Sequence, residues 1–190
     1  MCAGYIEILK STGMTLVLLS LAIFLSYVLG VCMFFKCIPY SISETFYLLE
    51  DVKKNLGYLF SLFCWGITFT LLPPLIERTD DSMQWVAFLA CAGLGFVGAA
   101  PFFKEFTEKK VHYIGAFTCI IFSQSLAIYN NWMIPLICWL AYLIATIFYM
   151  VNFGHGKFIP NYLSSRPMFW IEIVAFTSFY GSILIGGGVS

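Results

Sequence analysis

A few polar side chains interrupt an otherwise apolar sequence, and their types are those of an acyl-transfer catalyst. Ser43 lies in CIPYSISETFYLL, His112 in KKVHYIGAF and Glu172 in FWIEIVAF. A serine nucleophile needs a base within hydrogen-bond reach, and the base needs a group that orients it. We therefore predict Ser43, His112 and Glu172 as candidate catalytic residues, with Ser41 as an alternative nucleophile and Glu44 as an alternative orienting carboxylate.

Four neighbouring polar residues are candidates for binding the polar headgroup of a substrate. Ser41 and Glu44 lie in the first of these stretches, and Lys104 and Glu105 lie in PFFKEF. Ser41-x-x-Glu44 also fits a capping box, in which the serine oxygen accepts an early helix N–H and the glutamate bonds the cap N–H. This alternative predicts a short interfacial helix at roughly 42–54.

Metal and disulfide chemistry have weak support in the sequence. The 2 histidines, His112 and His155, lack the H-x-x-x-H spacing of a metal site, and the 7 cysteines contain no C-x-x-C pair. A metal site built from the histidines and the glutamates stays an alternative. No G-x-S-x-G elbow surrounds a serine. We expect neither a metal nor a cofactor.

The composition places these residues in a membrane protein. Of the 190 residues, 61% are hydrophobic and 11% are charged, and the mean hydropathy is +0.88. A water-soluble surface needs far more charge than this. Since 10 basic and 10 acidic residues leave no net charge, we expect no nucleic-acid partner. We expect an integral, multi-pass protein of a cell or plasma membrane, with membrane lipids as partners.

Apolar runs of about 20 residues recur along the chain, and each has the length of a membrane-crossing helix. We predict an all-α fold, a single domain over 1–190 that forms an integral membrane bundle of six transmembrane helices. The short interfacial helix follows the first span. The spans are predicted at 12–35, 56–76, 84–103, 111–129, 132–152 and 168–188. The first is read as a retained span, because the run is too long for a signal peptide.

The distribution of Lys and Arg predicts the orientation of the bundle. Eight of the 10 basic residues fall in the first, third and fifth loops: Lys36, Lys53, Lys54, Lys104, Lys109, Lys110, Lys157 and Arg166. The positive-inside rule places these loops in the cytoplasm and both termini outside. All the candidate site residues then belong to one membrane face. A lipid ester or amide would be the natural substrate there, which predicts a lipid hydrolase-like activity.

Two short motifs resemble a known family. IPYSISET after the first span and HYIGA at the start of the fourth resemble the six-span membrane family that contains the damage-regulated autophagy modulators and the GPI-anchor lipid-remodelling proteins. That family has a Y-I-S-[DE]-T-like loop and an H-x-x-G-A-like helix start. The matching residues are Ile42, Ser43, Glu44 and Thr45 in the first motif and His112, Gly115 and Ala116 in the second.

The chain also departs from that family. It lacks the glycine and the Pro-Glu pair that usually follow soon after the threonine. The family's loop is generally lumenal or external, whereas the distribution of Lys and Arg predicts a cytoplasmic loop. The chain is also similar to uncharacterised multipass bacterial proteins, which imply no function.

Transport is a competing class of function. The second and fifth spans carry LLPPL and WMIPLICW, and both contain Cys-Trp, as corresponding helices of two inverted repeats would. The polar residues predicted near the membrane midplane are Thr68, Thr70, Ser123 and Gln124.

A non-catalytic membrane scaffold or subunit is the third class. Cys91, Gly95 and Ala99 recur at four-residue spacing and form a small-x-x-x-small face. Such a face packs helices together within one chain, or joins two chains in a homo-oligomer.

Overall fold

The computed structural model describes residues 2–153 and 158–186, and all regular elements in these ranges are α-helices. They are α1 (Cys2–Phe35), α2 (Thr45–Val52), α3 (Tyr58–Arg78), α4 (Gln84–Ala99), α5 (Phe106–Asn131), α6 (Met133–Phe153), α7 (Phe158–Ser164) and α8 (Pro167–Ile185). The prediction of an all-α fold is confirmed.

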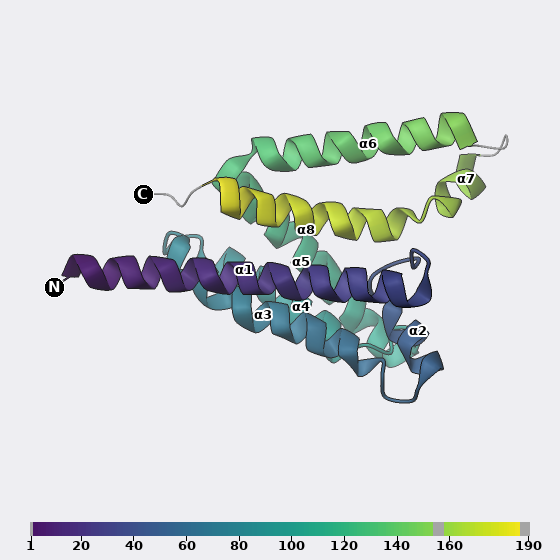
Figure 1. Ribbon diagram of the computed structural model, residues 1–190, viewed down its shortest axis with the longest axis horizontal. Coiled ribbons are helices and arrows are strands. Elements are labelled where there is room, and N and C mark those ends of the chain that lie inside the picture. Colours follow the sequence, from purple (N-terminus) through teal and green to yellow (C-terminus); the bar gives the residue numbers. More distant parts are fainter. Residues whose placement is uncertain (1, 154–157, 187–190) are drawn as a thin grey trace.

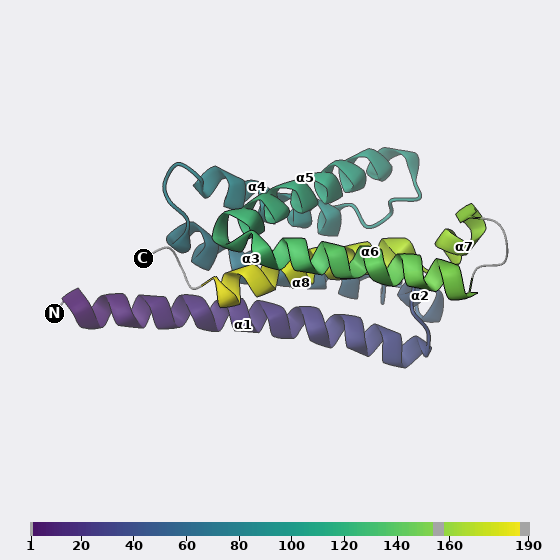
Figure 2. The ribbon, with the colours of Figure 1, turned by 90° about the horizontal axis from the view of Figure 1, so that it is seen from above.

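The six longer helices lie roughly along one axis and alternate in direction (Figures 1 and 2). The start of α1 and the end of α8 lie at one end of the bundle. The short helices α2 and α7 and the connection from α4 to α5 lie at the other end. The first, third and fifth loops therefore share one end, as the alternation of six antiparallel helices requires.

Five helices are long and apolar enough to cross a membrane: Thr12–Phe35 of α1, α3, α5, Met133–Asn152 of α6, and α8. The span predicted at 84–103 corresponds to α4, which has only 16 residues. At 1.5 Å per residue this helix is about 24 Å long, less than the roughly 30 Å of a hydrocarbon core. A helical membrane bundle is thus supported, and the count of six spans stays a prediction.

The backbones of α4 and α5 touch where two glycines face each other. A Cβ on Gly115 of α5 would lie 2.8 Å from the Gly93 carbonyl oxygen, and a Cβ on Gly93 would lie 2.5 Å from the Cys119 nitrogen. Small residues allow this close approach between membrane helices. Because Gly115 lies one turn after His112, the contact also places the histidine against the end of α4.

The small-residue face predicted on α4 is used mainly inside the chain. Thr68 of α3 donates a hydrogen bond to the Cys91 carbonyl at 3.3 Å, and a Cβ on Gly95 would lie 3.8 Å from the Thr68 methyl group. Ala99 is exposed. Self-association through this face stays a prediction.

The polar residues predicted near the midplane are hydrogen-bonded inside the bundle. The hydroxyl groups of three of them, Thr68, Thr70 and Ser123, donate to backbone carbonyl oxygens. The Gln124 oxygen accepts hydrogen bonds from Trp139 of α6 at 3.0 Å and from Ser178 of α8 at 2.8 Å. Thr68 and Gln124 therefore link different helices, whereas Thr70 and Ser123 bond carbonyl groups of their own helices.

Candidate active site

The turn between α1 and α2 presents Ser43. The Glu44 N–H donates to Ser41 Oγ at 3.1 Å, which is one half of the predicted capping box. The Glu44 carboxylate oxygen lies 3.9 Å from the Lys104 ammonium nitrogen, across the bundle end. The helix that follows, α2, covers Thr45–Val52 within the predicted 42–54. The predicted short helix after the first span is therefore present.

Thr45 locks this turn onto α1. Its hydroxyl lies 2.6 Å from the hydroxyl of Tyr27 and donates to the Ile42 carbonyl at 2.5 Å. The Thr45 side chain is fully buried. A side-chain hydroxyl that bonds the backbone of its own turn favours that turn over a helical continuation. The position of Ser43 is consequently set by two helices, α1 and α2.

A third helix, α8, holds the same turn through two further hydrogen bonds. The Ile42 N–H donates to the Glu172 carboxylate, and the Phe169 N–H of the first turn of α8 donates to the Tyr40 carbonyl at 3.0 Å. The second bond satisfies a helix N-terminal N–H that has no partner within its own helix. Glu172 thus bonds the backbone beside Ser43, and His112 has other partners.

His112 is buried at the start of α5, with 3% of its surface exposed. Its Nδ1 lies 2.9 Å from the Ala100 carbonyl oxygen and its Nε2 lies 3.2 Å from Ser43 Oγ. A carbonyl only accepts hydrogen bonds, so in the neutral imidazole the proton sits on Nδ1 and Nε2 is the acceptor. Ser43 therefore donates its hydroxyl proton to Nε2, the arrangement of a nucleophile and its base.

Aromatic rings cover the imidazole. The Phe103 ring stacks on His112 with centroids 4.6 Å apart, and Tyr47 packs edge-on against Phe103 at 5.1 Å. Excluding water from one face of the ring lowers the local dielectric and strengthens the hydrogen bonds that His112 makes. The connection from α4 to α5 supplies both the carbonyl that orients the base and the ring that covers it.

Lys104 forms a cationic rim beside this pair. Its ammonium lies 4.1 Å from the centroid of the Tyr47 ring, and its backbone N–H donates to the Tyr47 hydroxyl at 2.8 Å. Burial raises the pKa of the Tyr47 phenol, which therefore stays neutral. The side chain of Lys104 is 57% exposed and that of Glu44 is 30% exposed, so the ion pair between them is weak. The ammonium of Lys104 is therefore only weakly held by Glu44.

The structure thus gathers most of the predicted site residues at one end of the bundle, in two connected groups. One group runs from Ser41 through Glu44 to Lys104, and the other joins Ser43 to His112, with Glu172 behind the turn. Glu105 is exposed at the start of α5. His155 lies outside the described residues, and among those described no group of three His, Cys, Asp or Glu side chains could hold a metal ion.

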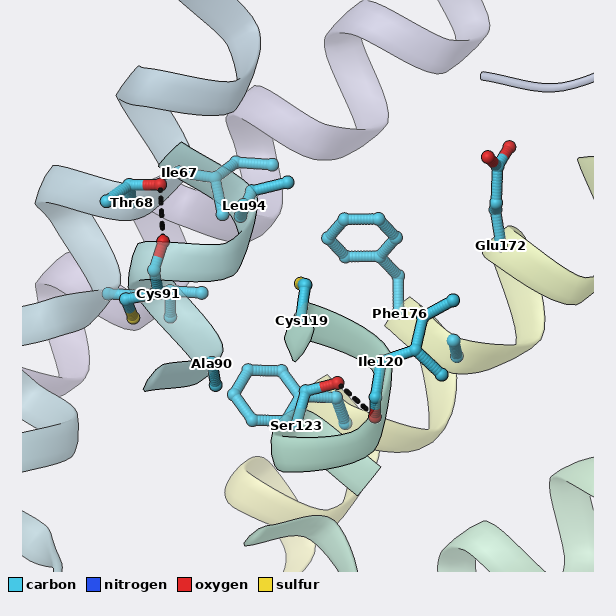
Figure 3. A pocket seen from close by; sticks show the side chains of 13 residues that line it. Ile67, Thr68, Ala90, Cys91, Leu94, Cys119, Ile120, Ser123, Glu172 and Phe176 are labelled. Carbon is cyan, nitrogen blue, oxygen red and sulfur yellow. Dashed lines mark hydrogen bonds between the residues drawn. The ribbon is translucent and has the colours of Figure 1, made fainter. Parts of the chain in front are cut away.

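Two small cavities lie inside the bundle next to this end. One, of about 60 Å³, is lined by Ser43 and Glu172 among apolar side chains of α3, α4, α5 and α8. The other, also about 60 Å³, lies deeper and shares Cys119, Phe176 and Glu172 with the first. Figure 3 shows the deeper cavity, where Glu172 stands apart from the polar groups of Thr68 and Ser123. Such volumes hold a few waters but no lipid chain, since one water needs about 10–15 Å³.

Sequence reasoning missed the Ala100 carbonyl and the covering ring of Phe103. One signal for the carbonyl was present, since Pro101 follows Ala100 directly. The residue before a proline is disfavoured in the α region, so helices end there and leave carbonyl groups without partners. The ring had no such signal, because its contact with His112 depends on the path of the loop.

No protein-family model matches the chain, and neither a curated protein nor a solved structure matches it. The resemblance carried by ISET and HYIGA therefore stays a prediction. Each of these two motifs contains one member of the Ser43–His112 pair.

Proposed function

We propose that this protein is a membrane-embedded hydrolase of lipid esters, with Ser43 as nucleophile and His112 as general base. The observation that carries the proposal is the hydrogen-bonded series from Ser43 Oγ to His112 Nε2 at 3.2 Å and from His112 Nδ1 to the Ala100 carbonyl at 2.9 Å. Activation of a serine requires a base with a free lone pair in reach and a second group that fixes its tautomer.

The reaction has two steps, and water is the co-reactant. Ser43 Oγ bonds to the ester carbonyl carbon, its proton moves to His112 Nε2, and the bond from this carbon to the alcohol oxygen breaks. The proton on Nε2 then passes to the departing alcohol oxygen. A water next loses a proton to Nε2 and attacks the carbonyl carbon of the acyl-serine. The bond from this carbon to Ser43 Oγ breaks, the proton on Nε2 returns to Oγ, and the carboxylic acid is released.

The position of the pair favours a lipid as the substrate. Ser43 follows the end of a 24-residue apolar span, where a helix leaves the hydrocarbon and ester groups of lipids lie. The exposed ammonium of Lys104 lies on the adjacent loop and carries the charge that a phosphate group would need.

Because the Ala100 carbonyl, and not a carboxylate, orients His112, we expect a slow enzyme. A backbone carbonyl holds the imidazole in the right tautomer but carries no full charge, whereas a carboxylate also stabilises the imidazolium that forms during reaction. Hydrogen bonds to ionised groups are roughly twice as strong as neutral ones. We therefore expect turnover well below the ~10 s⁻¹ that is typical of enzymes.

The proposal is tested by labelling the purified protein with a fluorophosphonate, which phosphonylates activated serines, and by assaying hydrolysis of fluorogenic acyl esters. We expect labelling at Ser43, located by mass spectrometry of peptides, and loss of both signals in Ser43→Ala and His112→Ala. Ser125→Ala is the control, because this exposed serine bonds only the Ile121 carbonyl of its own helix. Absence of label on Ser43 in a folded protein overturns the proposal.

A further inference from the structure

A groove of about 700 Å³ lies between α6 and α8, and Ile38, just after the end of α1, also lines it. In Figure 1 these two helices run side by side, with α8 between α6 and α1. Its volume falls in the range of about 300–1,000 Å³ that is typical of ligand sites. The helix α6 forms one wall, and only 6% of its most apolar window is buried by the rest of the chain. In a membrane this groove opens to the lipid.

The two walls of the groove follow helical spacing. On α6 the lining residues include Cys138, Ala141 and Ala145, whose small side chains leave room between the helices. On α8 they are Trp170, Val174 and Thr177, which recur at the intervals of one helix face. The opposite face of α8 carries Glu172 and Phe176, which line the cavities near Ser43. The helix α8 thus separates the groove from the proposed active site.

Polar side chains collect at one end of the groove, where α7 meets α8. The lining there includes Ser164, Ser165 and Arg166, with Tyr149 of α6. Both serine hydroxyls donate to carbonyl oxygens of α7 at 2.7 Å. Arg166 is exposed, and among the described residues it is the one charged residue in the lining. The groove thus pairs an apolar length with one cationic end.

The backbone of Arg166 adopts a left-handed conformation, with φ 57° and ψ 51°. This region is uncommon for residues other than glycine. Here the residue joins α7 to α8: its N–H donates to the Leu163 carbonyl at 3.3 Å, and its carbonyl accepts the Trp170 N–H at 3.3 Å. Trp170 is 40% exposed at the same end, as interfacial aromatic residues are.

We propose that this groove binds one anionic phospholipid, with the phosphate at Arg166 and an acyl chain between α6 and α8. A guanidinium donates two parallel hydrogen bonds to a phosphate, and none of the described lining residues is a carboxylate that would compete for it. The apolar walls match an acyl chain, and the surrounding bilayer supplies it. The site is a lipid-binding site separate from the Ser43–His112 pair.

Native mass spectrometry of the full chain in mild detergent tests this, with phosphatidylglycerol or phosphatidylcholine added at equal concentration. We expect one retained phosphatidylglycerol and at least about 10-fold weaker retention of phosphatidylcholine, because the choline cation next to the phosphate repels the Arg166 guanidinium and offsets the charge-assisted pair. Arg166→Gln removes this preference. The matched control Lys53→Gln, which removes an exposed cation of the same membrane face outside the groove, retains it.

A second pair of variants tests the apolar part. Ala145→Phe fills the groove and abolishes retention of the lipid, whereas Ile144→Phe, at an exposed neighbour outside the lining, leaves it unchanged. Equal retention of both lipids by the native chain, or unchanged retention in Arg166→Gln or Ala145→Phe, overturns the inference. Fluorophosphonate labelling of Ser43 is expected to persist in Arg166→Gln, so failure of either proposal can be told from failure of the other.

Discussion

Replacing Gly115 by alanine should push α5 away from α4 and separate Ser43 from His112. A Cβ at this position would lie 2.8 Å from the Gly93 carbonyl oxygen, 2.9 Å from Phe96 Cβ and 3.1 Å from the Val97 nitrogen. Two of these three neighbouring atoms are backbone atoms and the third is a Cβ fixed to its backbone, so no flexible side chain can turn aside. Overpacking of this kind typically costs about 1–3 kcal/mol.

The geometric effect can be worked from the same contacts. Ordinary van der Waals contact begins near 3.4 Å, so relief of the 2.8 Å contact requires a shift of 0.6 Å (3.4 − 2.8). Ser43 Oγ and His112 Nε2 are 3.2 Å apart. If the shift moves these two atoms directly apart, their distance becomes 3.8 Å (3.2 + 0.6), which is too long for a hydrogen bond. Misplacement of about 1 Å can cost about 100-fold in rate. We expect about 10- to 100-fold slower fluorophosphonate labelling.

The free energy of unfolding is measured in mixed detergent micelles, with tryptophan fluorescence as the signal. The rate of fluorophosphonate labelling of Ser43 is measured on the folded fraction. Gly95→Ala is the matched control on α4, since its Cβ would make only ordinary contacts at 3.8 Å and beyond. We expect this control to behave like the native chain. If Gly115→Ala and Gly95→Ala unfold and label alike, the α4–α5 backbone contact does not position His112 and the reasoning is wrong.

Substitutions at three further positions test the side chains that support the site and the helix bundle. Glu172→Ala leaves the Ile42 N–H without its acceptor and should cost about 1–3 kcal/mol in unfolding free energy, whereas Glu172→Gln keeps an acceptor oxygen and should lose less. Equal losses in the two variants would contradict this. Phe103→Ala uncovers the imidazole and should slow labelling of Ser43 several-fold with helicity unchanged in circular dichroism; a native labelling rate would show that the ring has no such effect. Gln124→Ala removes the acceptor of Trp139 and should loosen α6, seen as a red-shifted tryptophan emission that a native spectrum would refute.

Much of the membrane architecture follows from apolar run length alone. The predicted spans 12–35 and 132–152 agree closely with Thr12–Phe35 and Met133–Asn152. In lipid, the backbone N–H and C=O groups of an apolar run must form hydrogen bonds with one another. A helix forms these bonds within a single segment, so each such run is expected to be helical. The span predicted to reach residue 103 ends at Ala99. There the local effect of Pro101 outweighs the continuing hydrophobicity.

The sequence also determined that Ser43, His112 and Glu172 lie at one end of the bundle, because alternating helices return every second loop to the same side. Only the tertiary structure decided their partners. Ser43 and His112 are 69 positions apart, and they meet because α4 and α5 touch through glycines while three helices hold the turn before α2. Glu172 bonds a backbone N–H and not a charged side chain. Hydropathy and spacing act along the chain, whereas a 3.2 Å contact depends on how whole helices pack.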